Sequence, residues 1–462
     1  MTVKNDGALR AELDPLRKIL DFLRRTVLDG KSVERAAVLG FAAFFCLMAG
    51  YYALRPVRDL LGSEGGPQEL AENFTLTFVV TALLTPLYAK AVHRFDRRRF
   101  FFVSYGFLTI ALLAWAALFA LVDVASVSPL RRSYFVWISA YSLFLTSMFW
   151  SAMADAFRPS EGKMFFGGIA AGATCGGVLG PEITGRFAEH VATKHDAAAW
   201  SLIAAAVLTT IGVGFLTAAR AAAAACRRTA AVEAVAETAR PAPVPVGRPL
   251  DGLRVVLASP FLRLVACYLA LATLTGAFAY NAKSELARAE FPDRAARLAA
   301  LSSYESWTNI ATLVAQLLIT PLLLRFRGAG SALTILPFVQ ITGSVLIGLD
   351  PVFAMVAGYD VFSRAARHGV TTPTRESLFT AVKPHEKFQA KAFIDTVVYR
   401  FGDVVAAWLY FGARLLADDG GGGRAASLSI VNFGLAPVGL LWIYVARRTA
   451  AAAPSALRSD KR

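Results

Sequence analysis

Long apolar stretches separated by short polar segments run along the whole chain. Crossing a bilayer as a helix takes about 20 mostly apolar residues, and about twelve stretches reach that length. They lie at roughly 33–60, 71–92, 100–123, 132–157, 163–188, 197–222, 258–282, 299–324, 330–349, 352–380, 390–416 and 426–447. The pattern predicts an all-α membrane protein with about twelve transmembrane helices.

A repeat in the polar segments divides the chain into two halves. Thr-Pro-Leu occurs at 85–87 and again at 320–322, and an Arg-Phe pair follows each copy. Later in each half, Arg-Pro-Ser-Glu-Gly at 158–162 is matched by Lys-Pro-His-Glu-Lys at 383–387. Duplicated membrane proteins with many spans are typically secondary transporters, with a site between the halves near mid-membrane. We therefore expect two six-helix bundles related by a pseudo-two-fold axis along the membrane normal.

The pattern predicts a cytoplasmic N-terminal segment, two bundles, a cytoplasmic linker between them and a cytoplasmic tail. The N-terminal segment covers residues 1–32, the first bundle 33–222, the linker 223–252, the second bundle 253–448 and the tail 449–462. Residues 15–28 predict an amphipathic helix that either lies on the membrane surface or docks on the bundle. The linker is rich in Ala, Pro and Arg without apolar periodicity, so we expect it to be mobile.

Composition supports the membrane assignment. Of the 462 residues, 56% are hydrophobic and 18% are charged, less charge than a soluble chain carries. The net charge of +15 comes from basic residues that cluster between the apolar stretches, which favours cytoplasmic loops over a nucleic-acid partner. Every second loop is basic, and the positive-inside rule places these loops and both termini in the cytoplasm. We therefore expect a multi-pass protein of the cell (inner) membrane. The four cysteines form no Cys-x-x-Cys pair, so we expect neither a disulfide framework nor a metal site. We also expect no cofactor and a monomeric protein.

Charged residues near the end of the first span form the first candidate site. Arg55, Arg58 and Asp59 share one helix face, because they lie three and four positions apart. A charge at the bilayer centre costs on the order of 2.5–3.5 kcal/mol, so it rarely lacks a role. Two guanidiniums on one face make a fork-shaped anion site. The alternative is an Arg55–Asp59 pair with Arg58 at the membrane interface, and it leaves one cation unpaired.

The tenth span carries a second group of charges. Arg364 can pair with Asp360 or stack on His368 at one-turn spacing, whereas Arg367 has no local partner. Arg375, followed by a glutamate, is expected at the cytoplasmic end as a gate or a structural pair. Arg364, Arg367 and Arg375 are therefore candidates for substrate binding.

The eleventh span carries a polar stripe. Asp395, Tyr399 and Asp403 recur every fourth residue on an otherwise apolar helix. The two carboxylates either hold Arg400 or Arg367 in a buried network, or one of them carries a coupling proton.

Weaker candidates are Lys283 and Glu285 at the end of the seventh span and Glu305 in the eighth. Lys283 is long enough to snorkel to the surface. The residues expected to converge on a central polar cavity are Arg55, Arg58, Arg367 and Arg400, with Asp395 or Asp403 balancing part of their charge. The small residues at 167–177 predict close helix contact rather than a phosphate-binding loop, since no strand precedes them.

Three of these segments resemble the ATP/ADP-translocase-like (nucleotide exchange) family of the major facilitator superfamily, in its bacterial branch. Residues 51–59 are similar to the family's Tyr-x-x-Leu-Arg-x-x-Lys-Asp, with Arg58 in place of the Lys. Residues 149–165, which include Asp155, resemble its junction between the fourth and fifth spans, and 373–376 resembles its Pro-Thr-Lys-Glu. The resemblance implies a major-facilitator-type fold and antiport of nucleotides, with cationic side chains that bind phosphates. Asp155 joins the candidate site on this ground.

Two positions depart from that family. Thr372 stands where an acidic residue is expected, and Asp403 stands where nucleotide exchangers tend to carry Lys. An acid facing a phosphate is unfavourable. The expected substrate is therefore a small anionic solute, of which a nucleotide is one candidate.

Other functions stay open at this point. A proton-coupled transporter of organic anions or of a lipid precursor would use the same fold and arginines. A membrane-embedded transferase would need a catalytic cluster, but the five histidines are scattered and no His-x-x-x-His or Asp-x-Asp pair is present. We expect a transporter rather than an enzyme. Excess buried arginine favours exchange, because unneutralised cations oppose reorientation of the empty carrier.

Overall fold

The computed structural model describes residues 33–94, 96–191, 196–231, 249–379, 390, 393–394, 398–418 and 423–452. Within these ranges every regular element is a helix. The first half contains α2 (Val33–Glu64), α3 (Gly66–Arg94), α4 (Arg97–Leu121), α5 (Ser128–Ala156), α6 (Pro159–His190) and α7 (Asp196–Ala231). Ten helices of the described residues are long and apolar enough to cross a membrane, which confirms the predicted class of an all-α, multi-pass membrane protein.

The second half is more broken. Its helices are α8 (Pro249–Ala258), α9 (Pro260–Glu290), α10 (Arg294–Val314), α11 (Thr320–Leu349), α12 (Phe353–Ala365), α13 (Thr372–Phe379), α15 (Tyr399–Asp418) and α16 (Gly423–Ala452). Two π-helical segments, η1 (Ala315–Ile319) and η2 (Ala366–Thr371), interrupt the eighth and tenth spans. The expected tenth and eleventh spans are not among the ten, because their charged residues lower their hydropathy.

Local signals explain where several helices begin. The carboxylates of Asp96 and Asp293 accept hydrogen bonds from backbone N–H groups of the first turns of α4 and α10, and Ser259 does the same for α9. Proline occupies the first turn of α5, α6 and α9, where a missing N–H costs nothing. Gly328, with a φ of 73°, bends the chain between the eighth and ninth spans.

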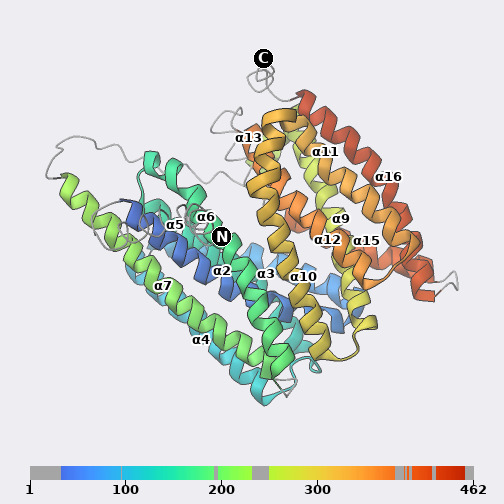
Figure 1. The fold of residues 1–462 in the computed structure, drawn as a ribbon, viewed down its shortest axis with the longest axis horizontal. Coiled ribbons are helices and arrows are strands. Elements are labelled where there is room, and N and C mark those ends of the chain that lie inside the picture. Colours follow the sequence, from blue (N-terminus) through green and yellow to red (C-terminus); the bar gives the residue numbers. More distant parts are fainter. Residues whose placement is uncertain are drawn as a thin grey trace, which may run out of the picture.

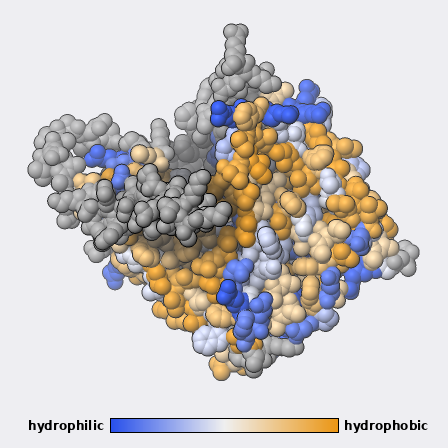
Figure 2. Space-filling model, in the orientation of Figure 1, coloured by the Kyte–Doolittle hydropathy of each residue, from blue (hydrophilic) through white to orange (hydrophobic). Residues whose placement is uncertain are grey.

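The helices form two groups (Figure 1). Most first-half helices, blue to green, lie on one side of the view, and the second-half helices, yellow to red, lie on the other, while α3 passes behind the second half and contacts α15. The groups approach each other low in the view and diverge toward the top. Orange, hydrophobic side chains cover much of both flanks in Figure 2, and a blue, hydrophilic strip lies low in the view near the middle. This distribution suits a protein with lipid around it and a polar seam between its halves.

Small residues of α6 allow a close helix contact, as the sequence predicts, and the structure shows that the partner is α2. A Cβ atom on Gly172, Gly176 or Gly180 would lie 2.5 Å or less from a backbone oxygen of α2. A Cβ atom on Gly167 would have nothing within 4 Å, so the close contact lies in the middle of α6 and not at its start.

Some boundaries differ from the expected ones. The helix α7 continues to Ala231 and α8 begins at Pro249, so part of the expected linker 223–252 is helical. The predicted amphipathic helix at 15–28, most of the linker and the motif at 383–387 lie outside the described residues. The predicted superposition of 158–162 on 383–387 therefore stays a prediction.

Candidate functional site

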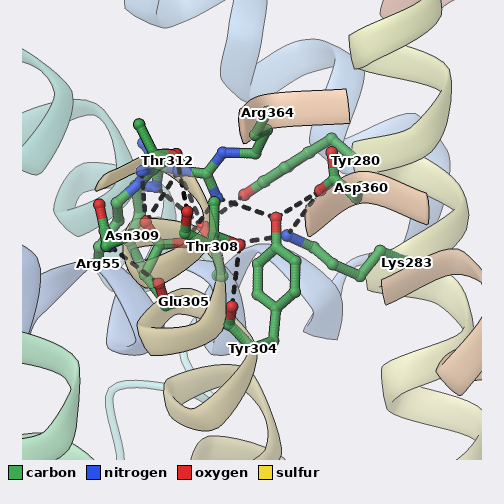
Figure 3. Close-up of polar contacts among 12 residues, drawn as sticks. Arg55, Tyr280, Lys283, Tyr304, Glu305, Thr308, Asn309, Thr312, Asp360 and Arg364 are labelled. Carbon is green, nitrogen blue, oxygen red and sulfur yellow. Dashed lines mark hydrogen bonds and ion pairs between the residues drawn. The ribbon is translucent and has the colours of Figure 1, made fainter. Parts of the chain in front are cut away.

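A cluster of charged and aromatic side chains lies between the two halves (Figure 3). We call it the central network. One helix of the first half, α2, faces three helices of the second half, α9, α10 and α12, across it. Its members are Arg55, Arg58, Asp59, Tyr280, Lys283, Tyr304, Glu305, Asp360 and Arg364. Four cations and three carboxylates are thus removed from lipid and held in contact with one another.

Glu305 is the acceptor at one end of the network. Its carboxylate accepts a hydrogen bond of 2.6 Å from Arg55 Nη1 and two bonds of 2.7 and 2.9 Å from the Arg364 guanidinium. The side chain of Glu305 is 2% exposed, against 18% for Arg55 and 13% for Arg364. The carboxylate therefore lies deeper than the two guanidiniums that it joins.

Asp59 is the acceptor at the other end. It accepts bonds of 3.1 and 2.8 Å from Arg58 and one of 2.8 Å from the Tyr280 hydroxyl, and Lys283 Nζ lies 3.7 Å away. Arg58 also lies over the ring of Phe135, 5.2 Å from its centroid. Cation–π contact and ion pairing together offset the cost of removing this guanidinium from water.

Lys283 connects the two ends. Its side chain is 1% exposed, and its Nζ atom lies 3.5 Å from Asp360 Oδ2 and 3.8 Å from the centroid of the Tyr304 ring. The Tyr304 hydroxyl donates to Asp360 at 2.5 Å and accepts from Arg364 at 2.9 Å. Lys283 therefore does not snorkel to the surface but is a buried structural centre of the network.

Arg367, Arg400 and Asp403 lie beside the network. The Asp403 carboxylate is within electrostatic range of the guanidiniums of Arg400, Arg367 and Arg58. Among the described residues, neither Arg367 nor Arg400 forms a direct ion pair; Arg367 donates to the backbone oxygen of Ala272, and its Nε atom is buried without a partner. The structure thus brings cations of both halves toward one carboxylate.

The π-helical segment η2 presents Arg367. A π turn widens the helix and frees backbone oxygens from the regular pattern, and such turns often occur at functional sites. Side-chain donors add to the backbone bonds here: the Thr372 hydroxyl donates to Arg367 O at 3.0 Å, and the Thr320 hydroxyl donates to Gly369 O at 2.6 Å. His368, on the same segment, is exposed.

Other predicted site residues lie elsewhere. Asp155, near the end of α5, lines a separate cavity of about 480 Å³ together with Phe102 and Arg220. Arg375 on α13 forms an ion pair of 3.0 Å with Glu376, which is the structural pair named as one of its two expected roles. Tyr399 is half-buried at the start of α15, where it packs against the core of the second half. Asp395 lies outside the described residues.

A second charged cluster joins the halves at the ends of α2, α9 and α10. We call it the interbundle clasp. Arg294 contacts Glu64 at 3.1 Å and Asp123 at 2.9 Å, Arg297 contacts Glu64 at 3.3 Å, and Arg288 donates to the backbone oxygen of Glu64. The basic loops of the sequence predict that this end faces away from the cytoplasm.

Two pairings that one-turn spacing allows do not form in the structure. Asp59 pairs with Arg58 and Lys283 instead of Arg55, and Arg364 pairs with Glu305 instead of Asp360. For Arg364 an interhelical partner displaces the local one, because Glu305 binds two nitrogens of its guanidinium. Asp59 instead pairs with its neighbour Arg58 on α2 and with Lys283 across the two halves.

Sequence reasoning also ranked Glu305 too low and missed Tyr280 and Tyr304. Glu305 does carry a signal, since it is a carboxylate inside an apolar span. The two tyrosines carry none, because aromatic residues are common in membrane helices.

Solved structures with the same arrangement are known. The chain is similar to the nucleoside transporter NupG, with a TM-score of 0.56 at 12% identity, covering 91% of this chain and 98% of that one. It is also similar to a bacterial homologue of the iron transporter ferroportin in an inward-facing state, with a TM-score of 0.61 at 11% identity, covering 91% and 100%. The fold is of the major facilitator type. An auto-inhibited POT-family peptide transporter matches with a TM-score of 0.55 at 14% identity, covering 91% and 96%.

At these identities the likeness shows the fold alone. No protein-family model and no curated protein sequence matches the chain. The resemblance to nucleotide exchangers therefore stays a prediction. In the described part of the chain, no group of three or more His, Cys, Asp or Glu side chains is placed to hold a metal ion.

Proposed function

We propose that this protein is a secondary active transporter that moves a small anionic solute across the membrane by alternating access. The observation that carries the proposal is the position of its cations. Arg58 of the first half and Arg367 and Arg400 of the second lie within electrostatic range of the one carboxylate of Asp403. Cations inside a membrane protein need an anion or water to offset their burial, and an anionic solute between the halves supplies it.

The conformation supports alternating access. The interbundle clasp joins the halves at one end, and the helix groups diverge toward the other (Figure 1). If the clasp end is external, as the basic loops predict, this conformation is inward-facing. Release of the clasp would then open the other route to the central network.

Nucleotides are the first substrates to test, because residues 51–59 and 373–376 resemble those of nucleotide exchangers. The experiment is uptake of labelled ATP, ADP and a panel of organic anions into proteoliposomes, with each anion also present inside as a counter-substrate. We expect uptake of at least one anion and stimulation by internal substrate.

Replacement of Arg58 by Gln tests the site. The Arg58→Gln variant should lose transport while it still inserts into the membrane, because its guanidinium contacts Asp59 and faces Asp403. A matched control is Arg131→Gln, which breaks an ion pair with Glu69 inside the first half. Normal transport by Arg58→Gln, or equal loss in both variants, would refute the assignment.

Proton-coupled transport is the second candidate. Asp403 favours it, because this partly exposed carboxylate inside the eleventh span has no direct ion pair among the described residues. The test is uptake into empty vesicles with and without an imposed pH gradient. Uptake that follows the gradient and disappears in Asp403→Asn would establish coupling, whereas uptake that needs internal substrate and ignores the gradient would establish exchange.

A further inference from the structure

Glu305 occupies a position with the properties of an anion-binding site. Two guanidiniums from opposite halves converge on it with three hydrogen bonds of 2.6 to 2.9 Å. Arg364 binds both of its oxygens, in the fork geometry that guanidinium also adopts with phosphate and with free carboxylates. The donors that hold Glu305 are therefore equally suited to an oxyanion from solution.

The two guanidiniums are also more accessible than the carboxylate they hold. Their side chains are 18% and 13% exposed, whereas that of Glu305 is 2% exposed. The Nε atom of Arg55 is buried without a partner, so Glu305 does not satisfy every donor of this guanidinium. The exposed His368 lies within electrostatic range of the same three side chains. Both arginine side chains are therefore more exposed to solvent than the carboxylate that they bind.

We propose that Glu305 is a built-in substitute for the substrate, whose carboxylate holds the Arg55–Arg364 position until an oxyanion of the solute takes it over. The inference rests on the proposed function as an anion transporter and adds to it the position of one anionic group. An arriving phosphate or carboxylate group would replace Glu305 as the acceptor. Because Arg55 and Glu305 belong to different halves, this exchange of partners also breaks a direct bond between them.

The replacement Glu305→Gln separates this role from a structural one. Gln has the same shape but no charge, so both guanidiniums lose their counter-ion and the melting temperature in detergent should fall by about 5–10 °C. Inorganic phosphate and sulfate should restore most of this loss, and chloride at the same ionic strength should not, because only the oxyanions fit the fork.

The matched control is Asp360→Asn. Asp360 is a buried carboxylate of the same network, but its cation partner Lys283 is 1% exposed and beyond the reach of a solute. This variant should also lose stability, and phosphate should not restore it. Equal rescue of both variants, or rescue of neither, would overturn the proposal.

Transport gives an independent readout. For an anion that the unmodified protein takes up, Glu305→Gln should lower KM about tenfold, the effect of one charged hydrogen bond that no longer has to be displaced. Asp360→Asn should not lower it. An unchanged or raised KM in Glu305→Gln would overturn the proposal. If the unmodified protein transports no anion at all, the proposed function fails, whereas rescue by phosphate tests the Glu305 position separately.

Discussion

The interbundle clasp makes a quantitative prediction about the conformational equilibrium. Replacement of Arg294 by Ala removes its contacts of 3.1 Å to Glu64 and 2.9 Å to Asp123, both across the two halves. The three side chains are 29%, 11% and 34% exposed, so each pair contributes about 0.5–1 kcal/mol rather than the value of a buried pair. The loss of about 1–2 kcal/mol should raise the population open at the clasp end by about 5- to 30-fold.

Cysteine labelling measures this population. Ser302 on α10 is 1% exposed and lies against α6, since a Cβ atom on Gly185 would be 3.4 Å from that of Ser302. A Ser302→Cys variant should therefore react with a membrane-impermeant maleimide only when the halves separate at this end. The background protein must first lose its native thiols, which are Cys46, Cys175, Cys226 and Cys267. Adding Arg294→Ala should speed labelling by about 5- to 30-fold.

The control is an ion pair at the same end that does not join the halves. Arg131 of α5 binds Glu69 of α3 at 2.5 Å, and both belong to the first half. The Arg131→Ala variant should lose stability without faster labelling at Ser302. Unchanged labelling in Arg294→Ala, or the same increase in Arg131→Ala, would refute the role of the clasp.

Two further predictions concern stability. Lys283→Ala should lower the free energy of unfolding by about 3–5 kcal/mol, because it removes the cation that pairs with the buried Asp360 carboxylate. Adding Asp360→Asn should restore part of the melting temperature in detergent, and no restoration would contradict the buried pairing. Gly180→Val should lower the free energy of unfolding by about 1–3 kcal/mol, because the added side chain overpacks against α2. Size-exclusion chromatography should show this as the loss of a monodisperse peak. The control is Gly167→Val, which should behave normally because a Cβ atom there has nothing within 4 Å.

The spans were predictable from the sequence for a physical reason. A helix in lipid must satisfy its own backbone hydrogen bonds and bury its apolar side chains locally, so each span shows in its own residues. The close contact of α2 and α6 was predictable for a similar reason, because glycines at Gly172, Gly176 and Gly180 leave the backbone uncovered on one face.

The pairings within the site were not predictable in the same way. The sequence identifies Arg55 and Arg364 as costly charges, but it does not say which carboxylate compensates them. Their shared partner Glu305 lies 250 and 59 positions away, at a contact set by how three helices pack. Local spacing favours other partners by only about 0.2–0.5 kcal/mol, which interhelical packing easily overrides.

The central network also explains why the tenth span had to be irregular. A regular helix through residues 353–379 would keep Asp360, Arg364 and Arg367 near one face, directed at the same neighbours. The π turn of η2 begins directly after the residues that bind Glu305 and Lys283. Arg364, before the π segment, is engaged by Glu305, whereas Arg367, inside it, forms no direct ion pair among the described residues. One span thus carries both an arginine that the network neutralises and, inside its π segment, an arginine that we propose is left for a solute.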